Sequence, residues 1–257
     1  MNSNLDENLS NRLRYALTAN AEELFQLLLD PHPDVLQAIL KNRQLNEEHL
    51  QALLKRRDLK EELLKKIYQR HTETLSHKLL LALVKNPCTP AGLIRNLLPR
   101  LRLFELVDLC LLPGVTPDQR LAAERAILQR LPTTPLGNRI TLARRATAPV
   151  VAEILKEGET QLVSACLNSP RLQEAAVYQF LHSTKATAET ISLIARHSRW
   201  QQRPNLRLAI LKNRQTPNVW FSLWLPNLQT PLLKQLRSGR RLNPAQQALV
   251  EAELKKR

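Results

Sequence analysis

The heptapeptide Ala-Ile-Leu-Lys-Asn-Arg-Gln occupies residues 38–44 and returns unchanged at residues 209–215. Weaker copies of its end, in which short apolar segments run into an asparagine, lie between the two. The asparagines are Asn42, Asn86, Asn168 and Asn213. Gaps of 44, 82 and 45 residues separate them, which predicts a two-unit period near 44 residues or a single unit near 22. A chain that repeats itself is most simply an array of stacked units, and such arrays usually bind partners along their faces.

The segments around these asparagines predict short helices. Leucine and alanine carry most of the apolar content, whereas aromatic residues make up 4% and glycine appears five times, which favours helices over strands. Thr-Pro pairs mark helix starts, because threonine caps the free amides and proline suits the first helical position. They lie at 89–90, 116–117, 134–135, 216–217 and 230–231. Asp58 with Glu61, and Thr116 with Gln119, have the spacing of capping boxes. We expect an all-α chain of about a dozen helices.

The repeated helix end and the Thr-Pro helix start together resemble HEAT-like and leucine-rich-variant repeats. The resemblance covers roughly residues 20–250 and implies an α-solenoid, a superhelical array of short antiparallel helix pairs. We therefore expect one helical-repeat domain over residues 1–257, with an acidic N-terminal cap at 1–33, repeats at 34–189 and basic repeats at 190–257. Some leucine-rich-variant proteins carry a cysteine cluster for an iron–sulfur centre. The cysteines of this chain, Cys88, Cys110 and Cys166, are scattered, so we expect no such centre and no other cofactor.

The charge of the chain predicts an anionic partner. Its formal net charge is +15, and no Asp or Glu occurs between Thr190 and Val250, a stretch that holds ten Lys or Arg residues. Cations at helix ends also offset the helix dipole without any ligand, so their position alone proves little. The dipole does not explain the missing acids, and we expect nucleic acid, DNA or RNA, as the partner.

The candidate binding residues are the cations of the repeated helix ends and of the basic C-terminal region. They are Lys41, Arg43, Lys212, Arg214, Arg237, Arg240 and Arg241. Trp200, between Arg199 and Arg203, is the candidate for an exposed ring that stacks on a base. For Trp220 and Trp224, four residues apart on one helical face, we favour a place in the core.

The sequence carries no recognisable catalytic or metal-binding motif, and we expect a non-catalytic protein without a metal site. Two other functions remain open. A helical-repeat scaffold would dock an acidic protein on the basic face. HEAT-like alkylpurine DNA glycosylases show that a basic helical array with tryptophans can also act on DNA, and such an enzyme would need an acid from an earlier repeat. No long uncharged apolar stretch or secretory leader is seen, so we expect a cytoplasmic chain that contacts no membrane.

Overall fold

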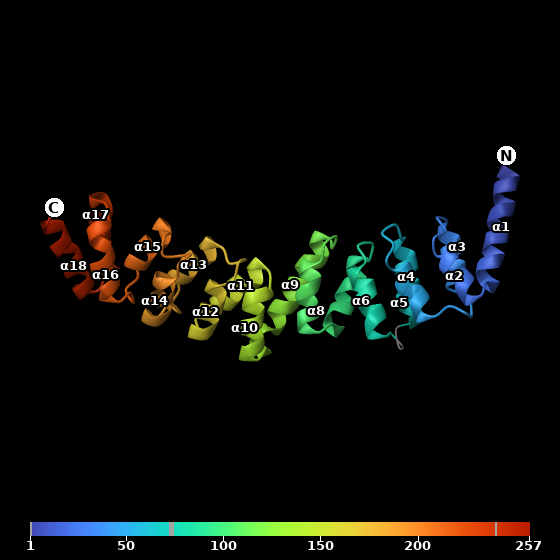
Figure 1. Cartoon of the computed structure of the whole chain (residues 1–257), viewed down its shortest axis with the longest axis horizontal. Helices are drawn as coiled ribbons and strands as arrows, with labels where there is room; N and C mark the ends of the chain where they lie inside the picture. The colour runs from blue at the N-terminus through green and yellow to red at the C-terminus, as the bar shows by residue number, and fades with distance from the viewer. Residues whose placement is uncertain (1, 72–74, 240) are drawn as a thin grey trace. The chain divides into compact units, whose positions relative to one another are not determined.

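The computed structural model describes residues 2–71, 75–239 and 241–257 (Figure 1). Within these ranges the chain is all-α, with eighteen α-helices, three short 3-10 helices and no strand. The number of helices exceeds the expected dozen because many are only seven to nine residues long. The chain divides into two compact units, which we call unit 1 (Met1–Ala126) and unit 2 (Ile127–Arg257).

Unit 1 contains the helices drawn from blue to green in Figure 1. They are α1 (Asn2–Thr18), α2 (Ala21–Leu27), α3 (Pro33–Ile39), α4 (Glu47–Leu53), α5 (Glu61–His71), α6 (His77–Lys85), α7 (Ala91–Leu97), η1 (Leu98–Arg100), α8 (Leu103–Leu111) and most of α9 (Pro117–Arg130). Unit 2 begins within α9. Its helices are η2 (Leu131–Thr133), α10 (Leu136–Arg145), α11 (Ala148–Leu155), α12 (Thr160–Leu167), α13 (Glu174–Leu181), α14 (Ala188–Arg196), α15 (Pro204–Leu211), α16 (Asn218–Trp224), η3 (Leu225–Asn227), α17 (Thr230–Ser238) and α18 (Pro244–Lys255).

Each helix packs mainly against the next helix or the next but one. In unit 1, α1 contacts α3 and α3 contacts α5, while α2 contacts α4 and α4 contacts α6. In unit 2, α10, α12 and α14 pack in succession, as do α11, α13 and α15. From α2 onward in unit 1, and throughout unit 2, alternate helices begin 24 to 30 residues apart. The structural repeat is therefore a helix pair of this length.

The periods of 44 and 22 residues that the asparagines predicted are wrong. Asn42 follows α3 and Asn86 follows α6, so the gap between them spans three helices. Asn168 follows α12 and Asn213 follows α15, again three helices later. Three helices make one and a half pairs. Successive copies of the motif therefore fall on different members of the pair.

Three of these asparagines join each helix end to the helix two places earlier. Asn86 is buried, and its Nδ2 donates to the carbonyl oxygens of Leu54 and Arg56 beyond the end of α4, at 2.9 and 2.7 Å. Its Oδ1 accepts from the amide of Cys88 at 2.8 Å. Asn42 and Asn213 make the same kinds of bond, whereas the exposed Asn168 donates only to Ser164 of its own helix.

Four of the Thr-Pro pairs lie at the starts of helices as expected, and the fifth, Thr230-Pro231, lies within the first turn of α17. Three of the threonines act on the helix before them. Thr116 forms the expected capping box with Gln119. Thr89 and Thr216 are instead buried, and their hydroxyls donate back to carbonyl oxygens of the preceding helices at 2.6 and 2.5 Å. Thr134 does the same at 2.8 Å. A threonine at this position bonds back to the helix that ends. The proline after it is the N-cap of the next helix at Pro90, Pro135 and Pro217, and not the first helical residue that the sequence predicted.

The predicted capping box of Asp58 and Glu61 does not form. The carboxylate of Asp58 accepts two hydrogen bonds from Arg56, at 2.9 and 2.6 Å. This hydrogen-bonded pair lowers the pKa of Asp58. The α5 helix begins at Glu61 without that cap.

The C-terminal core of unit 2 is built from leucines and aromatic rings. Its buried members are Leu211, Phe221, Leu225, Leu233, Leu236, Leu242 and Val250, and Trp224 packs against them. Trp220 is buried as well, and its ring centroid lies 5.2 Å from that of Trp224. The expectation of a place in the core is confirmed for Trp220, and Trp224 is partly buried against the core. None of the described helices is both long enough and apolar enough to span a membrane.

Candidate functional site

The cations of the acid-free stretch fall into two groups. In the first group, four arginines are held by contacts within unit 2. Arg199 donates to the carbonyl oxygens of Ser169 and Leu172, both at 2.8 Å. Arg203 lies 3.7 Å from the carboxylate of Glu174. Arg196 and Arg207 lie near the rings of Trp220 and Trp224, with guanidinium carbons 6.0 and 5.6 Å from the ring centroids.

The second group has no such contacts. Among the described residues, no side-chain hydrogen bond, ion pair or ring contact is found for five cations, which are Lys212, Arg214, Lys234, Arg237 and Arg241. Lys212 is half-buried and the other four are exposed. They follow the end of α15 or lie on and just after α17. Four of them were predicted from the sequence and Lys234 was not. Arg240, also predicted, lies outside the described residues.

Trp200 is not the exposed ring that its arginine neighbours suggested. It is only 1% exposed, and its indole Nε1 donates to the carbonyl oxygen of Leu167 at 3.1 Å. Arg199 covers its face, with the guanidinium carbon 4.3 Å from the ring centroid. A buried ring under a fixed guanidinium cannot stack on a base. The sequence interpretation of Trp200 as a stacking residue is therefore wrong.

Two of the partner-free cations, Lys212 and Arg241, line a groove formed by α13, α15 and α17. It contains two neighbouring cavities of about 560 and 580 Å³. Both are lined by Tyr178 of α13 and by Lys212 at the end of α15. Arg241 lines the first cavity, and Glu174 lines the second. The groove thus places two unpaired cations at a cavity that the acidic side chain does not line.

Tyr178 supplies the exposed aromatic ring that the sequence analysis assigned to Trp200. The residue is 45% exposed, and its ring centroid lies 4.4 Å from that of His182. The imidazole Nδ1 of His182 lies 2.8 Å from the carbonyl oxygen of Tyr178. The pair was missed because Tyr178 lies outside the acid-free stretch. Its spacing of four residues, which places both rings on one helical face, is the signal that would have found it.

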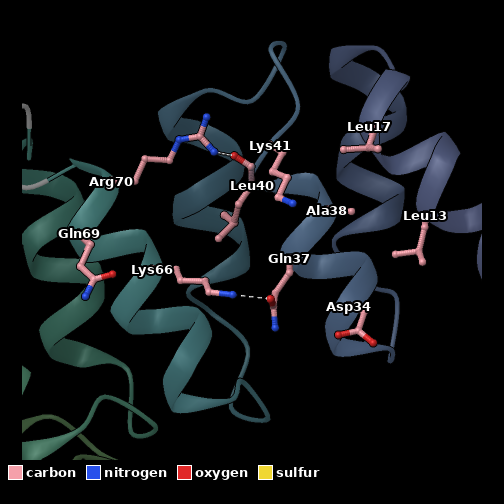
Figure 2. A pocket seen from close by; sticks show the side chains of 10 residues that line it. All are labelled: Leu13, Leu17, Asp34, Gln37, Ala38, Leu40, Lys41, Lys66, Gln69 and Arg70. Carbon is pink, nitrogen blue, oxygen red and sulfur yellow. Dashed lines mark hydrogen bonds between the residues drawn. The ribbon is translucent and has the colours of Figure 1, made fainter.

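Lys41 of the first heptapeptide lines an equivalent groove in unit 1, formed by α1, α3 and α5 (Figure 2). The cavity is about 740 Å³, with Leu13 and Leu17 of α1 along one side. Lys66 reaches across from α5 to the Gln37 side chain at 2.5 Å, and Arg70 donates to the carbonyl oxygen of Leu40 (Figure 2).

The two grooves use the same face of the repeated helix. Positions 34, 37 and 38 of α3 and position 41 after its end line the first, and positions 205, 208 and 209 of α15 and position 212 after its end line the second. The spacing is the same in both helices, so the shared Ala and Lys occupy matching places. Arg43 and Arg214 are exposed and line neither groove. Lys41 and Arg43 belong to unit 1, and the other predicted cations belong to unit 2.

The net charge is concentrated in one of the two units. Unit 2 holds 20 Lys or Arg against 7 Asp or Glu, whereas unit 1 holds 18 against 16. A formal excess of 13 positive charges therefore belongs to unit 2. The described residues contain no group of His, Cys, Asp and Glu side chains arranged to hold a metal ion. Comparison of the chain with protein-family models, with curated proteins and with solved structures returns no significant match.

Proposed function

We propose that the chain is a non-catalytic protein that binds a nucleic acid through the basic side chains of unit 2. The observation that carries the proposal is the set of five partner-free cations around the ends of α15 and α17, in a stretch without Asp or Glu. Cations without internal partners are available to an anionic polymer. Such contacts need no catalytic group, and we expect the chain to act in the cytoplasm.

The architecture that we propose for each unit is an α-solenoid of the HEAT-like class, in which helix pairs stack in a superhelical array. Its support is the regular packing of each helix on the next but one. Hydrogen bonds between successive pairs also recur at sequence separations of 26 to 33 residues, as between Asn86 and Leu54 or between Trp200 and Leu167. A stacked array presents the same helix face at each repeat, and α3 and α15 line their grooves with matching faces.

Electrostatics favour a polyanion over simple compensation of the helix dipoles. Each helix C-terminus carries about half a negative charge, so the ends of α15 and α17 contribute about one in total. Five cations lie on α17 or just after the ends of α15 and α17 in the sequence. The excess of about four positive charges is left uncompensated by the dipoles. A phosphate backbone that neutralises these charges releases counterions, which gives binding a steep dependence on salt.

The test is fluorescence anisotropy of the full-length protein with labelled single-stranded and double-stranded DNA and RNA at several salt concentrations. A quadruple variant replaces Lys212, Arg214, Arg237 and Arg241 with Gln. We expect binding at low salt, and a slope of log affinity against log salt that falls by about 3 in this variant. Binding to no probe at low salt would refute the proposal.

A matched control removes the same charge from unit 1, where four exposed lysines without observed side-chain partners can be changed to Gln. They are Lys55, Lys60, Lys78 and Lys85. We expect this control to lose much less affinity than the unit 2 variant. Equal losses would mean that net charge alone governs binding, and the assignment to unit 2 would then be wrong.

The groove of unit 1 supports a second candidate function, the docking of an acidic protein segment. Leu17 is 46% exposed and lines the groove with Leu13, and Lys41 lies between this apolar side and the α5 side chains of Lys66 and Arg70 (Figure 2). Apolar anchors beside a cation suit an amphipathic helix with carboxylates along one edge. Titration with a labelled acidic amphipathic peptide tests this. We expect Leu17→Lys to weaken binding by at least tenfold and added salt to have little effect; unchanged affinity of Leu17→Lys would exclude the groove.

A further inference from the structure

The cavity between α13, α15 and α17 has a feature that a phosphate backbone alone does not require. Tyr178 lines it with nearly half of its surface exposed, together with Lys212 and Arg241, which have no side-chain partner among the described residues. The cavity volume of about 560 Å³ lies within the usual range of small-molecule sites. Among the described residues, no Asp or Glu side chain lines it.

We propose that this cavity receives one unpaired base of a single-stranded nucleic acid, stacked on the ring of Tyr178. Lys212 and Arg241 contact the phosphates on either side of that base. The inference rests on the proposed function and narrows it to a class of ligand. Stacking on an aromatic ring tolerates every base, so this pocket selects unpaired strands without selecting a sequence.

The ring of Tyr178 is held in place by a neighbouring imidazole. His182, one turn later on the same helical face, packs against it at an interplanar angle of 36°. The imidazole is itself fixed by its contact with the carbonyl oxygen of Tyr178 at 2.8 Å. The Tyr178 ring is thus packed on one side against the His182 imidazole. Because the ring is already ordered, a base that stacks on it loses less conformational entropy on binding.

Duplex nucleic acid fits this cavity poorly. Its bases are already paired and stacked, and moving one of them onto Tyr178 would cost a few kcal/mol. A duplex can still reach Lys212 and Arg241 through its phosphates. The cavity also presents the polar side chains of Gln235 and Ser238, which suit the polar edges of an unpaired base. The geometry therefore favours the single strand over the duplex.

The test compares a labelled 12-nucleotide oligo(dT), an oligo(U) of equal length and a 12-base-pair DNA duplex, each titrated into full-length protein. Tyr178→Ala is expected to weaken binding of both single strands by about 5- to 100-fold. It should leave duplex affinity and the salt slope unchanged, because no charge is removed. Tyr178→Phe retains the ring and should stay within about twofold of the unaltered protein.

Two controls separate stacking from unfolding. Tyr15 in unit 1 has nearly the same exposure as Tyr178, 44% against 45%, so Tyr15→Ala should leave all three affinities unchanged. Tyr178→Leu keeps an apolar contact for His182 without an aromatic face, and it should weaken single-strand binding as Tyr178→Ala does.

The outcomes are distinguishable. If the unaltered protein binds no probe at low salt, the proposed function fails and this inference fails with it. If it binds single strands and duplex alike, and Tyr178→Ala changes neither, nucleic-acid binding stands while the base pocket is refuted. A loss limited to oligo(U) or to oligo(dT) would show that the 2′-hydroxyl or the thymine methyl group is also read, and would support the pocket for that strand.

Discussion

Replacing Asn86 with Ala should destabilise unit 1 more than any exposed substitution. The side chain is 2% exposed and makes three hydrogen bonds, to the carbonyl oxygens of Leu54 and Arg56 and from the amide of Cys88. In the variant all three backbone groups lose this partner. At about 1 to 1.5 kcal/mol for each unsatisfied group, the free energy of unfolding should fall by about 3 to 4.5 kcal/mol. That is a large part of the 5 to 15 kcal/mol that stabilises a typical domain.

The sequence provides the control for this substitution. Asn168 ends a similar segment but is exposed. It donates to Ser164 of its own helix, and its contact beyond that helix is long, 3.4 Å from its Oδ1 to Nε2 of His197, so Asn168→Ala should cost no more than about 0.5 kcal/mol. Urea unfolding followed by far-ultraviolet circular dichroism measures both variants. All three tryptophans lie in unit 2, so their fluorescence reports whether unit 2 is affected. Equal effects of the two alanines would refute the idea that the asparagine stabilises the stack by bonding between helices.

Two further predictions concern thiols and glycines. Burial raises the pKa of both Cys110 and Cys166 to about 12, so at pH 8 these thiols stay protonated. Ellman's reagent should therefore react rapidly with the half-buried Cys88 alone in the folded protein. After unfolding in urea it should react with all three thiols. Gly158 has a φ of +75°, and an added Cβ would lie 2.9 Å from a backbone oxygen, so Gly158→Ala should lower the melting temperature by several degrees. Gly137 is helical with open space around it, and Gly137→Ala should leave that temperature unchanged or raise it.

The helical class could be predicted from the sequence because it depends on local preferences. Leucine-rich segments bounded by Thr-Pro pairs become helices, and the capping box of Thr116 forms with a residue three positions away. The roles of Thr89 and Thr216 could not be predicted in this way. A hydroxyl between two helices can bond to either one, and burial in the stack directs it to the carbonyl behind.

The repeat period was predicted wrongly because the asparagine motif can end either helix of a pair. It marks a contact between helices, and so it does not recur once per pair. Any helix end that faces carbonyl groups of the helix two places earlier gains from an asparagine there, whichever member of the pair it terminates. Asn42 and Asn86 meet this need on alternate members. The 44 residues between these two asparagines therefore span three helices, and not a whole number of helix pairs.

The candidate site could be predicted only in part, because contacts with residues about 30 positions earlier decide which cations are already bonded within the protein. Arginines close to each other in the sequence have opposite uses: Arg199 bonds to carbonyl groups about 30 residues earlier, whereas Arg214 has no observed side-chain partner. A count of charges treats the ten cations of the acid-free stretch alike. It predicts a slope of log affinity against log salt of about 9 for a full set of duplex phosphate contacts. Four of the ten are occupied inside the protein, and five described cations remain. These five support a slope of about 4 to 5. A larger slope would require cations outside this set, because an arginine that leaves its carbonyl partners for a phosphate gives up hydrogen bonds that stabilise the fold.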